Sequence, residues 1–407
     1  MITAIAWRNI WRHRLRSMVV MLAAALGIFG TLFMIALSNG VVEQKIADSI
    51  HNETSHIQIH KPEFLQDNVL QHAMQDASEI SNVAQAIPGI KGVSSRIKTM
   101  AMASTASNGA GVIINGIDPE TEKLVTGIAG SVIDGTYFEG ESRSPQILIS
   151  RKLAGNLKAK TGSRIVITIQ NTDGELIYGL FRVAGIYKTA NALFDEPNVF
   201  VRRSDLAELT GFDPALSTEI ALLLQRTEDT DKTVAMLEEI YPGLSILPWY
   251  VIEPTLNMLS GMMDQFSYFL LVIILAAMAF GIVNTMLMSI LERTRELGML
   301  MAVGMNKKKV FIMIMLETIF LSGVGALVGV AMSYLTITLT SRNGINFAAW
   351  ADGFESLGYS ALIYPTIYAS FYFWLAVLVM ITAMFASVFP ARKALKLNPA
   401  EAIRHEA

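Results

Sequence analysis

The residues best suited to chemistry or to partner contact gather in one charged segment, residues 292–309. Its candidate residues are Glu292, Arg293, Thr294, Arg295, Glu296, Leu297, Gly298 and Gly304, and three lysines follow at 307–309. The mixed charges predict a short exposed helix, and the two glycines predict that it is broken. Such a segment offers charged side chains to a partner protein, or it is a basic loop that only fixes topology. Charge alone leaves both interpretations open.

Motifs of catalysis are absent from the sequence. It has no Gly-x-Ser-x-Gly elbow, no His-Glu-x-x-His motif, no Gly-x-x-x-x-Gly-Lys-Ser/Thr phosphate loop and no cysteine. We therefore expect no catalytic residue, and no metal or cofactor bound by this chain. His56, Gln58 and His60 would share one face of a strand. Two histidines at that spacing could bind a metal, but we favour a half-exposed strand face.

Glu317 is a candidate of a different kind, because it interrupts a long apolar run. A carboxylate inside a membrane segment is costly and is therefore a candidate functional residue. It could face a partner protein, cap the base of its helix, reach solvent, or pair with Arg293 or Lys309. The sequence leaves these alternatives open.

Four apolar runs are long enough to position these residues as membrane-spanning helices. The chain is 52% hydrophobic and 16% charged, whereas soluble domains carry roughly 25% charged residues. About 20 apolar residues cross a bilayer as a helix, so we expect spans at 18–38, 266–291, 310–340 and 367–390. The first run is longer than the apolar core of a cleavable signal peptide, so we expect it to be retained.

Small residues inside these runs predict close helix packing. Gly325 and Gly329 form a Gly-x-x-x-Gly pattern in the third run, and Gly27 lies in a similar stretch of the first. Such residues let two helix backbones approach each other. The alternative is chance, because glycine is common in membrane helices.

Basic residues predict the orientation of the spans. Lysine and arginine are concentrated before the first run, between the second and third, and after the fourth, whereas residues 39–265 are acidic overall. Basic flanks face the cytoplasm. We therefore expect an interfacial amphipathic helix at 1–17, a cytoplasmic segment at 292–309 and a cytoplasmic tail at 391–407. Residues 39–265 and 341–366 would lie on the other side, and no nucleic-acid partner is expected.

Residues 39–265 are numerous enough to form a domain with its own core, and their pattern predicts a mixed α/β fold with helical stalks at both ends. A hairpin is expected from strands at 164–170 and 176–188, because the Asp-Gly pair in Asn171–Gly174 is a strong turn signal. Further strands are expected at 55–60, 98–105, 111–115 and 146–150. Helices are expected at 78–87, 151–157, 204–209 and 229–240.

The charged segment also carries a resemblance to a known family. Glu292–Gly298, followed by Ala302-Val303-Gly304, resembles the coupling segment of the ABC permease superfamily that contains FtsX, MacB, LolC and LolE. The opening Ala6–Asn9, the tail motifs 390–394 and 398–403, and Gly116–Pro119 in the large domain are similar as well. The resemblance covers the whole chain and includes its layout of one long and one short external loop.

The resemblance implies a machine in which two permeases pair above two ATPase subunits. The second permease would be identical or homologous, and ATP and Mg²⁺ would be bound by the ATPase. Glu292–Gly304 would couple ATP hydrolysis to movement of a periplasmic domain in the bacterial inner membrane. The resemblance also implies a hydrophobic cleft between spans one and two, with the following candidate residues: Phe29, Phe33, Met258, Met262, Met263 and Phe266.

Three functions remain open within this resemblance. The first is release of lipoproteins or another amphiphile from the outer leaflet, and the second is efflux of a drug or peptide. The third is an FtsX-like transducer that controls a cell-wall hydrolase without transport. A periplasmic carrier or adaptor is a further partner. In place of the carrier-binding hook of LolC, however, this chain has only the tight turn Asn171–Gly174.

Overall fold

The structure is a computed structural model that describes residues 2–12, 14–138 and 144–395. The tail motif at 398–403 lies outside these residues. The chain divides into two compact units. Unit 1 comprises residues up to 42, 260–346 and from 362 onward, and unit 2 comprises residues 43–259 and 347–361.

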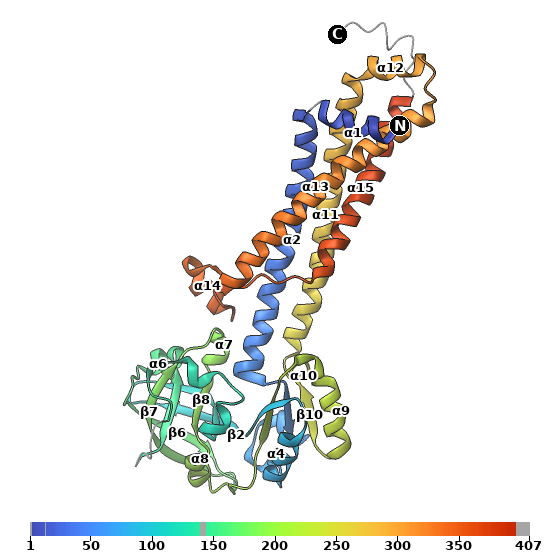
Figure 1. Cartoon of the computed structure of the whole chain (residues 1–407). Coiled ribbons are helices and arrows are strands. Elements are labelled where there is room, and N and C mark those ends of the chain that lie inside the picture. Colours follow the sequence, from blue (N-terminus) through green and yellow to red (C-terminus); the bar gives the residue numbers. More distant parts are fainter. Residues whose placement is uncertain (1, 13, 139–143, 396–407) are drawn as a thin grey trace. The chain divides into compact units, whose positions relative to one another are not determined.

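Unit 1 is built from helices (Figure 1). Four of them are long and apolar enough to cross a membrane: α2 (Arg14–Ser49), α11 (Pro254–Glu292), α13 (Lys307–Asn343) and α15 (Ala369–Leu395). The first three contain the predicted spans 18–38, 266–291 and 310–340, and α15 begins two residues after the start of the predicted span 367–390. The four helices confirm the predicted helical membrane fold. Helix α2 continues past the boundary of unit 1 at its C-terminal end, and α11 begins before that boundary at its N-terminal end. The residues between each apolar run and unit 2 also favour helix.

Close helix packing in unit 1 depends on two of the three candidate glycines. A Cβ atom added at Gly325 would lie 2.8 Å from the Cβ of Ala24, and one added at Gly329 would lie 2.7 Å from the carbonyl oxygen of Ala25. Helices α13 and α2 therefore touch backbone to backbone at this seam. Gly27 differs, because an added Cβ there would meet no atom within 4 Å. Within this chain it is not a packing residue.

The amphipathic helix α1 (Ile2–Arg12) packs on α13. Its buried side carries Ala6 and Ile10, while Trp7 and Trp11 are about half exposed. The ring of Trp7 lies edge-on to Phe320 of α13, with ring centroids 5.7 Å apart. An apolar face against the bundle and exposed indoles beside arginines suit a helix at the membrane surface.

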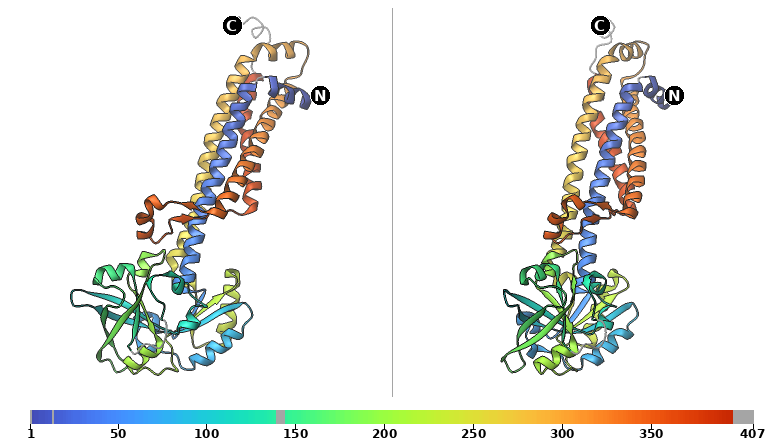
Figure 2. Two further views of the ribbon diagram at one scale, coloured as in Figure 1. Left: turned by 60° about the vertical axis from the view of Figure 1, so that its left-hand side comes forward. Right: turned by 90° about the vertical axis from the view of Figure 1, so that its left-hand side faces the viewer.

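Unit 2 contains a closed six-stranded barrel (Figure 2). Its strands pair in the order β2 (Ile90–Ser104), β3 (Gly109–Ile117), β8 (Asn198–Arg202), β5 (Gln146–Ser150), β7 (Leu176–Tyr187) and β6 (Arg164–Gln170), and β6 pairs back with β2. The barrel interior is apolar and includes Ile114, Ile149, Ile167 and Phe181. Helices α6 (Arg151–Leu157) and α8 (Arg203–Thr210) pack against it, and β4 (Val132–Gly135) extends the sheet beside β7.

A second lobe uses the first half of β2. Strands β10 (Ser245–Pro248), β1 (Ile57–His60) and β9 (Glu219–Leu224) continue the sheet from β2, with antiparallel pairing throughout. Helices α4 (Ala77–Ala86) and α9 (Thr230–Ile240) complete its core. The 15-residue strand β2 therefore belongs to both lobes. The mixed α/β class and the hairpin of β6 and β7 are confirmed, and β2 is longer than predicted.

The prediction of a half-exposed face for His56, Gln58 and His60 is wrong, because all three are buried. Strand β1 lies between β9 and β10, so neither of its edges is open. His56 accepts from the amide of Leu224 (3.1 Å) and lies 3.0 Å from the hydroxyl of Thr227. His60 Nε2 donates to Gln58 Oε1 (3.0 Å), and Gln58 Nε2 donates to the carbonyl of Thr54 (2.8 Å). Among the described residues no cluster could hold a metal ion.

Candidate functional site

The charged segment predicted from the sequence folds as the short helix α12 (Thr294–Ala302) between α11 and α13. The chain turns at Arg293, where the backbone leaves helical geometry. It turns again at Gly304, whose φ of +99° is costly for any residue with a Cβ. The side chain of Asn306 then caps α13 by accepting from the amide of Lys308 (3.1 Å). Two turns with clear local causes thus position α12.

A buried ion pair joins this segment to α13. Arg293 Nη1 donates to both carboxylate oxygens of Glu317, at 3.0 and 3.2 Å. Arg293 is 8% exposed and Glu317 7% exposed. Of the alternatives that the sequence leaves open for Glu317, the structure shows the one with Arg293. Charge-assisted bonds in a desolvated setting are strong and directional, so the start of α12 is held to α13.

Glu296 extends this pair toward the surface. Its carboxylate accepts from Arg293 Nε (3.2 Å) and lies 3.3 Å from Arg12 Nη2 of α1. The Arg12 side chain is 65% exposed, so that outer contact contributes little to stability. The network nevertheless connects α1, α12 and α13. Nothing in the local sequence distinguishes Arg12 from the other basic residues of its flank, so this contact was not predictable.

The two sides of α12 differ in exposure. Leu297 and Gly298 are buried against the rest of unit 1. Arg295, Met299 and Val303 are exposed. Their four-residue spacing places them on one stripe of the helix surface. The structure therefore separates the two central arginines of the segment, with Arg293 directed inward and Arg295 available to a partner.

A cavity of about 270 Å³ opens between α2 and α11 within unit 1. Its walls are apolar or small, and the residues that line it are Val20, Ala23, Ala24, Gly27, Ile274, Ala277, Met278, Gly281, Ile282 and Thr285. The space exists because small residues face each other on the two helices. Gly27 therefore lines a cavity. The small residues Ala277 and Gly281 in the second apolar run are the sequence signal for this space.

The residues predicted to form a substrate cleft lie elsewhere. None of the six lines this cavity. The rings of Phe29 and Phe33 stack with centroids 5.9 Å apart. Met258, Met262 and Phe266 are exposed and Met263 is half-buried. Their role in substrate contact stays a prediction.

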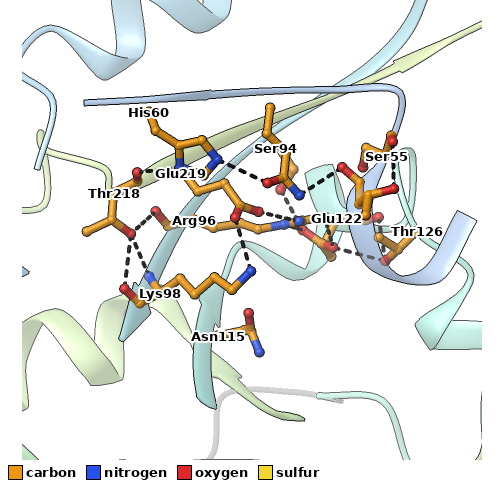
Figure 3. A network of polar contacts seen from close by, with 12 residues as sticks. Ser55, His60, Ser94, Arg96, Lys98, Asn115, Glu122, Thr126, Thr218 and Glu219 are labelled. Carbon is orange, nitrogen blue, oxygen red and sulfur yellow. Dashed lines mark hydrogen bonds and ion pairs between the residues drawn. The ribbon is translucent and has the colours of Figure 1, made fainter. Parts of the chain in front are cut away.

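Unit 2 contains a second buried charge cluster (Figure 3). Arg96 of β2 donates to Glu122 Oε1 (2.8 Å) and to Glu219 Oε1 (2.6 Å), and Lys98 Nζ lies 3.3 Å from Glu219 Oε2. Ser94 and Thr126 donate to Glu122. Both carboxylates are fully buried. Because the described partners satisfy these oxygens, the cluster is suited to structure and not to proton transfer.

The electrostatics of this cluster agree with a permanently charged core. Burial alone would lower the pKa of Arg96, but the charges of Glu122 and Glu219 outweigh it and raise that pKa. Burial alone would raise the pKa of Glu219, but Lys98 and Arg96 lower it to about 2. Glu122 lies at the end of α5 (Pro119–Glu122), which Asp118 caps, and Glu219 begins β9. The cluster ties β2 to the first strand residue of β9 and to α5.

Comparison with known proteins accounts for most of the chain. The model for "FtsX-like permease C-terminal" matches residues 268–399, and the model for "MacB-like periplasmic core domain" matches residues 17–240. The first match contains α12, α13 and α15, and the second contains all of α2 after its first three residues and most of unit 2.

Several characterised or named proteins are similar along nearly the whole chain. The macrolide export ATP-binding/permease protein MacB of Escherichia coli is 24% identical over 97% of this chain, and the chain spans 59% of that protein's length. The uncharacterized ABC transporter permease YknZ of Bacillus subtilis is 22% identical, with 98% of each chain covered. The lipoprotein-releasing system transmembrane protein LolC of Neisseria meningitidis is 22% identical, over 96% of this chain and 94% of LolC.

The matched models cover only permease and periplasmic segments, in agreement with the absence of a phosphate loop from the sequence. Four long apolar helices and a mixed-sheet domain between the first two of them are the architecture that these matches require. The chain therefore belongs to the ABC permeases that combine an FtsX-like permease region with a MacB-like periplasmic core domain.

Proposed function

We propose that this permease acts on an amphiphile, such as a lipoprotein, and releases it from the outer leaflet of the bacterial inner membrane. The observation that supports this most is the apolar cavity between α2 and α11. A cavity with apolar walls favours an apolar occupant, and an acyl chain is the apolar group that a membrane amphiphile supplies. Similarity to the lipoprotein-releasing protein LolC supports the same substrate class.

Efflux of a drug or peptide is the second candidate. It is supported by similarity to the macrolide export protein MacB, and an apolar cavity would accept a hydrophobic drug as well. An FtsX-like transducer that controls a cell-wall hydrolase is the candidate of another class. Such a transducer would need no ligand in the cavity, and this difference separates it from both transport functions.

The partners follow from the permease family and the exposed surfaces. We propose that two ABC ATPase subunits dock on the stripe of Arg295, Met299 and Val303, and that they supply the ATP and Mg²⁺ chemistry. Helix α11 is the least buried of the four long helices, which supports pairing with a second permease, identical or homologous, or direct contact with lipid. Both termini would be cytoplasmic and residues 39–265 periplasmic.

We also propose a periplasmic carrier as a partner, but this chain has no LolC-type hook to bind it. Strands β6 and β7 are joined by a tight turn in which Gly174 has a φ of +85° and the amide of Gly174 donates to the carbonyl of Asn171 (3.2 Å). This turn leaves no room for an inserted loop, so a carrier would have to use another surface.

Filling the cavity tests the proposal. Ala277→Phe places a large side chain in the cavity, whereas Ala276→Phe on the same helix is a matched control outside it. The full-length chain would be purified gently from native membranes and its bound lipids and proteins identified by mass spectrometry. We expect bound lipoprotein or another acylated amphiphile with the native chain and the control, and its loss with Ala277→Phe.

The same purification separates the alternatives. A periplasmic adaptor with an outer-membrane duct would favour efflux, and a cell-wall hydrolase would favour the transducer. Equal amphiphile binding by Ala277→Phe and the control would refute the role of the cavity. Absence of any ABC ATPase after mild crosslinking would refute the proposed complex.

A further inference from the structure

The connection between α13 and α15 leaves the helical unit and returns to it. It departs after β11 (Ile345–Asn346) and returns at β12 (Leu362–Ile363), and residues 347–361 between them belong to unit 2. We call these residues the 347–361 segment. A loop that only closed the bundle would not need to fold with the other unit.

The 347–361 segment has an internal structure of its own. The ring of Phe347 lies beside those of Trp350 and Phe354, with centroids 6.2 and 5.7 Å apart. Its two ends are joined by the amide of Phe347, which donates to the carbonyl of Ala361 (2.7 Å). The amide of Tyr359 donates to the carbonyl of Phe354 (2.9 Å). A segment closed in this way can transmit a displacement of its ends.

One lysine holds the segment to the rest of unit 2. Lys45, near the end of α2, donates to the carbonyl of Gly358, and its ammonium lies 5.6 Å from the centre of the Tyr359 ring. The backbone of Gly358 has a φ of +75°. A Cβ atom added there would lie 2.5 Å from both Lys45 Nζ and Asn191 Oδ1. Only glycine fits this position without displacing its partners.

Asn191 brings a third part of unit 2 to the same place. Its Oδ1 caps α7 (Ala192–Asp195) by accepting from the amide of Leu193 (3.1 Å). Its Nδ2 donates to Glu53 Oε1, which lies in the single π-helical turn η1 (Ile50–Thr54) that follows α2. Such π-turns are frequent at functional positions. The end of α2, the α7 loop and the 347–361 segment therefore meet at Lys45 and Asn191.

We propose that this contact is a third mechanical attachment of the periplasmic domain. Helices α2 and α11 each run into unit 2, and the 347–361 segment connects α13 and α15 to it as well. Movement of the ends of α13 and α15 would then reach unit 2 through Lys45 and Gly358. This inference rests on the proposed ATP-driven function only in its second test, because the contact itself can be tested without the ATPase.

The first test measures hydrogen exchange of the full-length chain in lipid nanodiscs. Gly358→Ala introduces a Cβ into Lys45 and Asn191, whereas Gly353→Ala in the same segment meets no atom within 4 Å and is the matched control. Lys45→Met is a second variant, which removes the donor and keeps a long apolar side chain. We expect amides of the 347–361 segment to exchange roughly tenfold faster in Gly358→Ala and Lys45→Met, because a charge-assisted bond is lost.

Unchanged exchange in both variants, or equal acceleration in Gly353→Ala, would overturn the contact. The second test adds the ATPase subunit that co-purifies and compares exchange in unit 2 with and without ATP. We expect the ATP-dependent change in unit 2 to shrink several-fold in Lys45→Met while ATP hydrolysis persists. A full ATP response in a variant whose segment is already loosened would overturn the coupling. Failure of the native chain to bind any ATPase would refute the proposed function and leave the first test decisive for the contact.

Discussion

Removal of one partner of the Arg293–Glu317 pair is the sharpest perturbation of the 292–304 segment. Glu317→Gln keeps the size of the side chain and removes its charge, so buried Arg293 would lose its buried counter-ion and keep only the partly exposed Glu296. The double variant Arg293→Met with Glu317→Met removes both charges and fills the site with apolar atoms. Together they separate the effect of an unpaired charge from the effect of losing the pair.

The magnitude follows from the geometry. At 3.0 Å two unit charges attract by roughly 5–6 kcal/mol at an effective dielectric constant of about 20. The desolvation that the pair already costs offsets part of this, and breaking a buried pair on one side typically costs about 3–5 kcal/mol. In a helical unit of this size such a loss lowers the midpoint of thermal unfolding by roughly 10 °C. The double Met variant should lie within a few degrees of the native chain.

Thermal unfolding of the detergent-solubilised chain, followed by tryptophan fluorescence, is a suitable assay. Three of the five tryptophans, Trp7, Trp11 and Trp374, lie in unit 1, whereas Trp249 and Trp350 lie in unit 2. The variants would therefore be compared in a background in which Trp249 and Trp350 are replaced by Phe, so that the signal reports on the helices. A midpoint for Glu317→Gln equal to that of the native chain would refute the claim that the pair is buried and stabilising. A double variant as unstable as the single one would show that packing, and not the unpaired charge, is responsible.

Arg295 provides the functional contrast. It is exposed on α12, and surface substitutions change stability by less than about 0.5 kcal/mol. We therefore expect Arg295→Glu to leave the unfolding midpoint unchanged and to weaken ATPase binding in a pull-down at least tenfold, because interface charges of the wrong sign cost several kcal/mol. Arg293→Glu should act on stability as well, because it would place two carboxylates together. Normal ATPase binding by Arg295→Glu would contradict the proposed docking surface.

Three further predictions concern packing and the periplasmic domain. Gly329→Ala should lower the unfolding midpoint by several degrees, because its Cβ would collide with α2, whereas Gly323→Ala has open space and should not. Arg96→Met should destabilise unit 2 by roughly 3–5 kcal/mol in chemical denaturation, because it leaves Glu122 buried without a counter-charge, and a loss below 1 kcal/mol would contradict this. Burial lowers the pKa of His60 from its ordinary 6.5 to about 4. The contribution of neutral His60 to the free energy of unfolding is therefore fully present above pH 6.5 and is lost as the pH falls through 4. The loss amounts to at most about 3 kcal/mol. A His60→Asn variant whose stability depends on pH in the same way as that of the native chain would refute this prediction.

Local properties of the sequence predicted the membrane fold and part of unit 2. The four spans were predictable because hydropathy depends on each segment alone. The β6–β7 hairpin was predictable because its turn is a local Asp-Gly signal. Strands β8 and β9 were not predicted, because each is a short apolar stretch whose pairing partners are distant in the chain. Barrel closure by β6 on β2 joins residues more than 60 positions apart, so no local signal carries it.

In the candidate site, too, some features follow from the local sequence and others only from contacts between distant residues. The residue pattern alone predicts that residues 292–304 form a charged, glycine-bounded segment between two membrane helices, and it marks Glu317 as an unusual carboxylate with several possible environments. The pairing of Glu317 with Arg293 follows only from the packing of the helices. Arg293 and Arg295 are chemically identical. They differ because only the side chain of Arg293 is directed toward Glu317, which lies 24 positions later in the chain. Likewise, Gly27 and Gly329 are both glycines in apolar helices. One borders a cavity and the other packs against a backbone, because the position of the neighbouring helix determines what each of them meets.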